Sequence, residues 1–271
     1  MRLRRLLTIL ALVPVLAWTL FPLYWILMAS FKTELSLYAR PPQWLFSPIF
    51  DNYTHVLFTI PFFQYLGNSV VIALGTTAGS LVLGTLAAYG FSRVKFRGSE
   101  ALRFLVLVTR MVPRMTLVVP YYLLMLKIGM LDTHTGLVTA YVSFALPFSI
   151  WLLIGFFDDV PIEVEEAALV DGCTSLGALI RIVIPIAAPG LAVAAIFAFL
   201  VSWNEFLFAL ILSGPASKTL PVVIAGLTTD VGPLYGEMSA AAVLVMLPNI
   251  VMTLLMQRYV VRGLTLGAVK G

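Results

Sequence analysis

The chain has 271 residues, of which 61% are hydrophobic and 11% are charged. Typical soluble domains have about 45–50% apolar and about 25% charged residues. A fold of this size has too little interior to bury so much apolar surface, so most side chains must contact lipid. The composition therefore argues against a water-soluble globular protein, and the mean hydropathy of +1.00 agrees.

The chain offers few residues for redox or metal chemistry. Its one cysteine, Cys173, cannot form an internal disulfide, and its two histidines, His55 and His134, cannot by themselves build a catalytic zinc site. We therefore expect no metal site. The net charge is +4, but Lys and Arg are spread along the chain without a nucleic-acid-binding motif. We interpret the positive charge as a determinant of membrane orientation and expect no nucleic-acid partner.

Charge-poor apolar stretches predict six transmembrane helices, because about 20 apolar residues are needed to cross a hydrocarbon layer of about 30 Å. The first stretch is too long for a cleaved signal peptide, whose apolar region runs about 7–15 residues. In the second, Gly75 and Gly79 allow a neighbouring helix to approach closely. The fold class is an all-α integral membrane protein with a single transmembrane domain over residues 1–271. The expected spans cover about residues 6–31, 69–91, 104–126, 136–157, 186–212 and 238–257.

The distribution of basic residues predicts that both termini lie in the cytoplasm. Six spans place the two termini on one side of the membrane. Of the seventeen Lys and Arg, eleven then fall on that side, four on the other, and two within the third span. Basic residues concentrate in cytoplasmic loops. On the outer side, residues 32–61 contain Pro41, Pro42 and Pro48, which favour an extended middle rather than a folded domain.

The inward loop over residues 158–185 is the most acidic stretch and predicts two short helices. Pro161 suits the first position of the first helix, and the acids near it suit the positive end of the helix dipole. Gly172 provides a break. Thr174 can cap a second helix. The apolar residues of that second helix recur at helical spacing: Leu176, Leu179, Ile180, Val183 and Ile184.

The spacing in this loop resembles the EAA loop of ABC-importer permeases. That pattern is Glu-Ala-Ala, three residues, Gly, nine residues, Ile-x-Leu-Pro, and the chain departs from it only by Ile184 in place of Leu. The resemblance implies that residues 158–185 carry the coupling helix, which sits in a cleft of the ATPase subunit in that family. The residues it assigns to ATPase coupling are Glu165, Glu166, Ala167, Ala168, Asp171, Gly172, Ile182 and Pro185.

Two further segments are similar to the carbohydrate-uptake (maltose-type) branch of this family: residues 202–206, which read Ser-Trp-Asn-Glu-Phe, and the C-terminal residues 257–271. The resemblance implies a type I ABC-importer permease fold in the cytoplasmic membrane of a bacterium or archaeon. It implies as partners a homologous second permease, two cytoplasmic ATPase subunits, an extracytoplasmic sugar-binding protein and membrane lipid. ATP and Mg²⁺ would bind to the ATPases, with no cofactor in this chain. In maltose-type relatives the tail, here residues 263–271, reaches the ATPase dimer interface.

No enzymatic motif accompanies these features, so we expect no catalytic residue. Residues 214–219 are the nearest approach to a phosphate-binding loop, but they lack its second glycine and its spacing. An alternative function is a secondary transporter or channel that acts without an ATPase. Such a protein needs ionisable groups within the membrane for ion coupling, and this chain has few. A membrane-embedded enzyme is a weaker alternative, because neither GxSxG nor HExxH occurs.

Polar residues inside predicted spans are candidate functional residues, because burying them in lipid is costly. Arg110 and Arg114 lie one helical turn apart; they either pair with acids or extend to the inner surface, or they line the translocation path. Trp203, Asn204 and Glu205 combine a stacking ring with amide and carboxylate groups, which suits sugar hydroxyls. We take these three as substrate-path candidates, with helix packing as the alternative.

Overall fold

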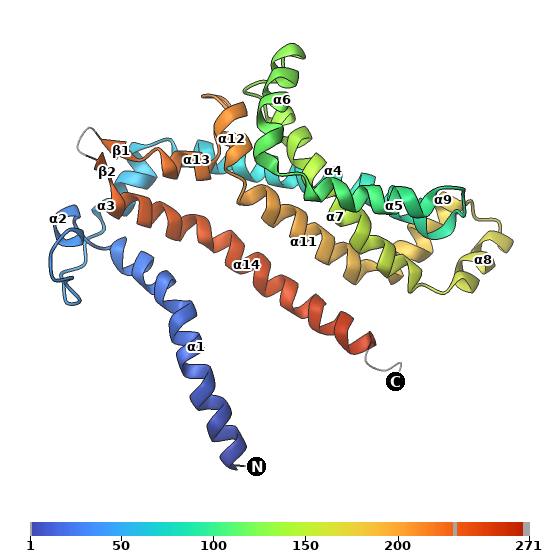
Figure 1. The fold of residues 1–271 in the computed structure, drawn as a ribbon, viewed down its shortest axis with the longest axis horizontal. Helices are drawn as coiled ribbons and strands as arrows, with labels where there is room; N and C mark the ends of the chain where they lie inside the picture. Colours follow the sequence, from blue (N-terminus) through green and yellow to red (C-terminus); the bar gives the residue numbers. More distant parts are fainter. Residues whose placement is uncertain (1, 230–231, 268–271) are drawn as a thin grey trace. The chain divides into compact units, whose positions relative to one another are not determined.

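The computed structural model describes residues 2–229 and 232–267, with side chains described for 10–229 and 232–257. The described chain is almost entirely helical, and Figure 1 shows long helices joined by short connections. It divides into two compact units. One unit contains the residues up to Gln64 together with Val222–Pro248, and the other contains Tyr65–Pro221 and the residues from Asn249 onward.

The first unit surrounds the predicted outward loop. Within it, residues 38–50 form no regular helix or strand. Asn52 fixes this loop by donating hydrogen bonds to the carbonyls of Ser30 and Lys32, and Glu34 accepts one from the Gly236 amide at 2.7 Å. Its elements are α1 (Arg2–Ala29), α2 (Glu34–Leu37), α3 (Asp51–Thr54), the π-turn η1 (His55–Thr59), β1 (Thr228–Thr229), β2 (Gly232–Pro233) and most of α13 (Leu220–Ala225). The two strands pair antiparallel.

The second unit contains the long helices α4 and α7 and the inward loop. Two helices, α4 (Phe62–Arg93) and α14 (Tyr235–Gly267), run through both units. The other elements are α5 (Ser99–Val108), the 3₁₀ turn η2 (Thr109–Met111), α6 (Arg114–Lys127), α7 (His134–Asp158), α8 (Ile162–Val170), α9 (Ser175–Ala178), the π-turn η3 (Leu179–Val183), α10 (Ile184–Ile186), α11 (Ala188–Trp203) and α12 (Leu207–Leu212).

Helices α4 and α7 approach closely at the predicted small-residue pair. A Cβ atom added to Gly75 would lie 2.9 Å from a methyl of Val138, and one added to Gly79 would lie 3.0 Å from a methyl of Val142. Side chains at these positions would push the two helices apart. The close helix approach expected from this spacing is therefore confirmed within the unit.

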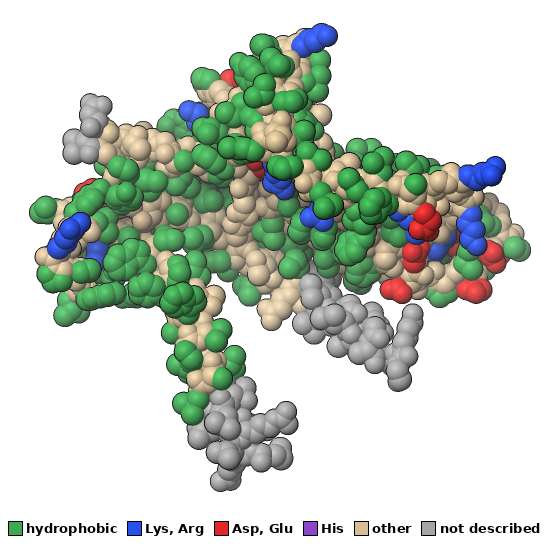
Figure 2. Space-filling model, viewed as in Figure 1, with side chains coloured by type: hydrophobic (Ala, Val, Ile, Leu, Met, Phe, Trp, Pro, Cys, Tyr) green, Lys and Arg blue, Asp and Glu red, His purple; other side chains and the backbone are tan. Residues whose placement is uncertain are grey.

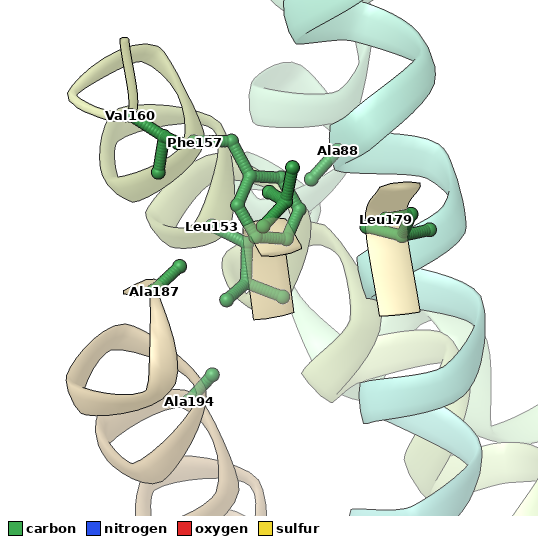
Figure 3. Close-up of a cluster of buried hydrophobic side chains, with 8 residues drawn as sticks. Ala88, Leu153, Phe157, Val160, Leu179, Ala187 and Ala194 are labelled. Atoms are coloured by element: carbon green, nitrogen blue, oxygen red, sulfur yellow. The ribbon is translucent and has the colours of Figure 1, made fainter. Parts of the chain in front are cut away.

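A hydrophobic cluster joins the ends of α4, α7 and α11 that lie nearest the 158–185 loop to η3 (Figure 3). Phe157 and Leu153 of α7 lie at its centre and are fully buried. Because η3 belongs to the inward loop, this packing seats the loop on the long helices rather than leaving it in solvent. The members of the cluster are Ala88, Leu153, Phe157, Val160, Leu179, Val183, Ala187 and Ala194.

Four helices in the described part of the chain are long and apolar enough to cross a membrane: Leu10–Ala29, Phe62–Arg93, His134–Asp158 and Tyr235–Gln257. A fifth span is possible if Ser175–Ile186 and Ala188–Trp203, which meet at a bend of 83°, are counted together. The protein is thus a mostly helical membrane protein with four or five uninterrupted or bent candidate spans, fewer than the six predicted.

The other two predicted spans, over residues 104–126 and 186–212, are not continuous helices. The stretch over residues 104–126 is divided between α5 and α6, because Pro113 cannot continue a helix and holds Val112 in an extended conformation (ψ 122°). The stretch over residues 186–212 is interrupted after Trp203, where α11 ends and a separate α12 begins. The expectation of two continuous helices there was wrong.

Candidate coupling site and membrane-embedded polar residues

The first helix of the inward loop, α8, has sharp boundaries that its sequence explains. Pro161 occupies the N-cap position, one residue before the first helical position at which we expected it. At the other end, Asp171 is the C-cap, and Gly172 adopts φ +89°, a left-handed conformation that only glycine adopts without strain. The predicted helix and break are confirmed.

One face of α8 is fastened to the C-terminal end of α4. Glu165 is buried, and its Oε2 accepts a hydrogen bond from Nε of Arg93 at 2.7 Å. The Tyr89 hydroxyl donates to the other carboxylate oxygen and also contacts the carbonyl of Ser175. Arg93 in addition donates to the carbonyl of Val160, just before α8. These contacts hold α8 to α4 through one buried ion pair and its hydrogen bonds.

The rest of the α8 surface is exposed and carries both acidic and apolar side chains. Its large apolar side chains, Ile162, Val164, Leu169 and Val170, are between 42% and 87% exposed. Of the residues assigned to coupling, Glu166 and Ala167 also lie on the exposed side, whereas Ala168 is buried on the same side of α8 as Glu165. Figure 2 shows acidic and basic side chains gathered around the end of the unit that carries α8 and α9. Exposed apolar side chains rimmed by charge are typical of a protein-contact surface.

The second half of the inward loop differs in part from its predicted helical stripe. Thr174 caps α9 by accepting a hydrogen bond from the Gly177 amide at 3.1 Å, as expected. Leu179 and Val183 are fully buried, but Leu176 and Ile180 are exposed. The π-turn η3 departs from the 3.6-residue spacing of an α-helix over Leu179–Val183, which includes Ile180 but not Leu176. Among the remaining coupling candidates, Ile182 is half-buried and Pro185 and Asp171 are exposed.

The Trp203-Asn204-Glu205 segment lies at the break between α11 and α12, and its three side chains face different ways. Trp203 is only 2% exposed and stacks on Phe199. Glu205 is buried; its carboxylate accepts hydrogen bonds from the Phe208 and Ala209 amides at 3.1–3.2 Å and so caps the start of α12. Asn204 alone is exposed. This geometry assigns Trp203 and Glu205 to packing and capping, the alternative that the sequence left open.

Asn204 forms a reciprocal amide pair with Asn249 of α14. Nδ2 of Asn249 donates to Oδ1 of Asn204 at 2.8 Å, and Nδ2 of Asn204 donates back at 3.3 Å while also bonding the Leu200 carbonyl. Because Trp203 and Glu205 are buried, Asn204 is the only one of the three path candidates whose side chain is accessible. In the part of the chain that the structure describes, no group of three or more His, Cys, Asp or Glu could hold a metal ion.

Comparison with known proteins identifies the family. Residues 80–265 match the family described as binding-protein-dependent transport system inner membrane component. The chain belongs to this family. It is therefore a multi-pass ABC-transporter permease of the inner membrane and is not itself catalytic.

The permease has relatives that match over nearly its whole length. It is 35% identical to the trehalose/maltose transport system permease protein MalG of Thermococcus litoralis, over 99% of this chain and 98% of the relative. It is 38% identical to the trehalose transport system permease protein SugB of Mycobacterium tuberculosis (95% and 94%) and 37% identical to the sulfoquinovosyl glycerol transport system permease protein SmoH of Agrobacterium fabrum (93% and 89%).

A solved structure shares the fold of the permease. It is a bacterial ABC transporter involved in the import of the acidic polysaccharide alginate, with a TM-score of 0.78, 22% identity and coverage of 95% of this chain and 96% of that chain. The family match includes α8, the loop around it and the break after α11. The fold resemblance expected from the inward loop is confirmed.

Arg93 was missed as a site residue at the level of sequence. It was counted only among the basic residues that set membrane orientation, because nothing local distinguishes it from Lys95 or Arg97. Its partner Glu165 is 72 positions away in the chain. The only available signal was its place at the C-terminal end of a long apolar stretch.

Proposed function

We propose that this permease is one of two membrane subunits of a sugar importer, paired with a homologous permease and two cytoplasmic ATPases and supplied by an extracytoplasmic sugar-binding protein. The names of the relatives support a carbohydrate cargo, since those proteins transport trehalose, maltose or a sulfoquinovosyl glycerol. ATP and Mg²⁺ bind to the ATPases. Transport follows alternating access: ATP-driven closure of the ATPases rotates the helices, and this rotation opens the central cavity to the outer side.

In this proposal the chain crosses the membrane six times. Segments α5–η2–α6 form a broken third span, and α11 with α12 forms a broken fifth span. Irregular backbone at membrane depth is compatible with this, provided that it is buried in protein or lines a water-filled cavity. The excess of Lys and Arg on the side of the termini places both termini in the cytoplasm. Of the tail over residues 263–271, residues 268–271 lie outside the described part of the chain, and its contact with the ATPases stays a prediction.

The observation that carries the proposal is the two-sided construction of α8. Its exposed side, which includes Glu166, Ala167 and the exposed apolar side chains, docks in the cleft of an ATPase. Its buried face transmits the movement, because the ion pair between Arg93 and Glu165 and the hydrophobic cluster around Phe157 fasten the loop to the long helices. A rigid connection is needed here, since a docked helix on a loose tether would move without moving the gate.

The test uses the reconstituted complex with all its subunits in vesicles. We expect Glu166→Lys and Gly172→Leu to remain in the membrane but to abolish ATP-driven uptake of cargo, because the first reverses a charge on the docking face and the second forces a side chain into the left-handed turn. Glu100→Lys, an exposed acid on α5, is the matched charge control and should retain uptake. Uptake at the wild-type rate by either coupling variant would refute the role of α8.

A further inference from the structure

Arg110 and Arg114 are held near the middle of the membrane-spanning region. The guanidinium carbon of Arg110 lies 4.7 Å from the ring centre of Phe148, and that of Arg114 lies 5.3 Å from the ring centre of Phe144. Both rings belong to the central turns of α7, a 25-residue span. The arginines therefore do not extend to the inner surface, which was one of the two explanations that their sequence spacing allowed.

Neither arginine has an acidic partner in the described part of the chain. The ion pairs found there are those of Arg93 with Glu165 and of His55 with Glu237. Neither Arg110 nor Arg114 donates a hydrogen bond to a described group, and both are exposed. A ring face satisfies one face of a guanidinium, but the N–H groups along its edge stay available. Two such cations at membrane depth need either water or an anion.

The backbone beside the two arginines also indicates a water-filled surface. Helix α5 ends at Val108, the turn η2 ends at Met111, and α6 begins at Arg114, so the chain is irregular between the two cations. Irregular backbone in lipid would leave unpaired polar groups, which is why it occurs only inside protein or along an aqueous cavity. Figure 2 shows basic side chains set in hydrophobic surface where α5 meets α6.

Aromatic and hydroxyl groups adjoin the cations on the same helices. Tyr121 packs on Phe144, with the ring centres 5.7 Å apart, and its hydroxyl donates to Ser143 at 2.5 Å. Ser143 is exposed. The ring of Phe144 packs in turn on the buried ring of Phe208, with ring centres 4.7 Å apart. An aromatic surface suits the apolar face of a sugar ring, hydroxyls suit its hydroxyls, and a guanidinium suits a carboxylate, sulfonate or phosphate.

We propose that Arg110, Arg114, Tyr121, Ser143, Phe144 and Phe148 form a binding site for an anionic carbohydrate, so that the cargo of this importer carries a carboxylate, sulfonate or phosphate group. This inference rests on the proposed function and makes its substrate class narrower. A lipid headgroup offers the same phosphate chemistry, but headgroups lie at the membrane surface, whereas the two guanidinium groups lie against the middle of α7. The anion therefore comes from the cargo.

The test is ligand-induced thermal stabilisation of the complete complex, held with ADP and vanadate in nanodiscs of neutral lipid. The probes are glucuronate, sulfoquinovose and glucose 6-phosphate, with glucose as the neutral match and inorganic phosphate as the free anion. We expect at least one charged sugar to raise the melting temperature, with little effect of glucose or phosphate. Arg110→Gln and Arg114→Gln should each raise the concentration of charged sugar needed for that stabilisation by about tenfold or more, because each removes charge-assisted hydrogen bonds. Arg97→Gln, an exposed arginine outside the site, should not.

Several outcomes would overturn the proposal. These are an equal response to glucose and glucuronate, no response to any charged sugar, an equal response to inorganic phosphate, or full retention of the response in both variants. Loss of the second permease from either variant on gel filtration would instead assign the arginines to the subunit contact. Loss of the response in nanodiscs of anionic lipid would assign them to lipid. In each case the coupling test on Glu166 and Gly172 still decides the proposed function separately.

Discussion

Arg93 and Glu165 form a buried ion pair, with Nε and Oε2 2.7 Å apart, that joins the last residue of α4 to the middle of α8. Both side chains are about nine-tenths buried. Burying two charges is costly, so we infer that this ion pair serves to fix a geometry rather than to add stability. Here it fixes the orientation of α8, with one face against α4 and the other open to a partner.

Removing one member of this pair should destabilise the permease more than removing both. Arg93→Met or Glu165→Leu alone leaves a buried charge without its partner, which costs about 3–5 kcal/mol. The double variant replaces both charges by apolar groups and should recover much of that loss. Thermal unfolding of the purified complex measures the effect. Strictly additive losses in the double variant would show that the two side chains act independently.

Gly172 should tolerate asparagine better than alanine. Its φ of +89° is in the left-handed region, which costs an ordinary L-residue about 1–2 kcal/mol. Asparagine enters this region more readily than alanine does. No atom lies within 4 Å of a Cβ added at Gly172, so crowding inside the chain does not confuse the comparison. The measurement is melting temperature together with the ratio of cargo moved to ATP hydrolysed. Equal behaviour of Gly172→Ala and wild type would contradict the turn as a constraint.

Glu205 should act as a helix cap rather than as a contact for cargo. Glu205→Gln keeps an acceptor oxygen for the Phe208 and Ala209 amides and should retain most stability and uptake. Glu205→Leu leaves both amides unpaired and should cost about 0.5–2 kcal/mol or more. Melting temperature and the KM for uptake separate the two roles. A raised KM in Glu205→Gln at unchanged stability would assign Glu205 to the cargo path.

Asp132 should give the permease a stability contribution that is lost in acid. It lies in the turn between α6 and α7 and fastens residues 214–217 to that turn. Partial burial opposes its ionisation, but hydrogen bonds from the Ala216 amide, the Ser217 hydroxyl and amide, and the Gly214 amide outweigh this and lower its pKa. A carboxyl with a lowered pKa stabilises the folded state above its unfolded pKa, and this contribution disappears as the pH falls through the folded value.

The comparison of wild type with Asp132→Asn across pH tests this contribution. Asparagine keeps the shape and tolerates the φ of +53° at this position but lacks the charge. We expect the variant to melt below wild type at pH 7, and the difference to shrink as the pH falls below about 4. There the carboxyl of the unfolded chain becomes protonated, whereas that of the folded protein stays ionised down to its lowered pKa. A difference that does not change with pH would mean that the charge of Asp132 contributes nothing.

Local signals predicted the inward loop well. The helix α8, the break at Gly172 after it and the cap at Thr174 follow from turn and capping preferences that need no tertiary contact. The apolar stripe after Thr174 failed in part, because η3 replaces α-helical spacing by a wider turn. Leu179 and Val183 of this turn pack in the hydrophobic cluster around Phe157, and such packing is not visible in the periodicity of the segment.

Long-range contacts and helix breaks account for what the sequence did not show. The ion pair of Arg93 with Glu165 joins residues far apart in the chain, and a single sequence carries no signal for such a pair. The breaks at Pro113 and after Trp203 were hidden because apolar composition continues through both. Pro113 is a local signal for a helix break, but the high hydropathy of the stretch favoured a continuous span. The break after Trp203 has its local cause in Glu205, whose carboxylate caps the next helix.

The most direct test of the permease as a gate driven from outside compares two preparations in vesicles. One contains the complete complex with its binding protein, and the other contains only the two permease subunits. We expect uptake of cargo by the complete complex to require ATP on the side of the ATPases, and uptake by the permease pair alone to be absent. Equal, ATP-independent uptake by the permease pair alone would contradict the role assigned to α8 and would favour a transporter or channel that needs no ATPase.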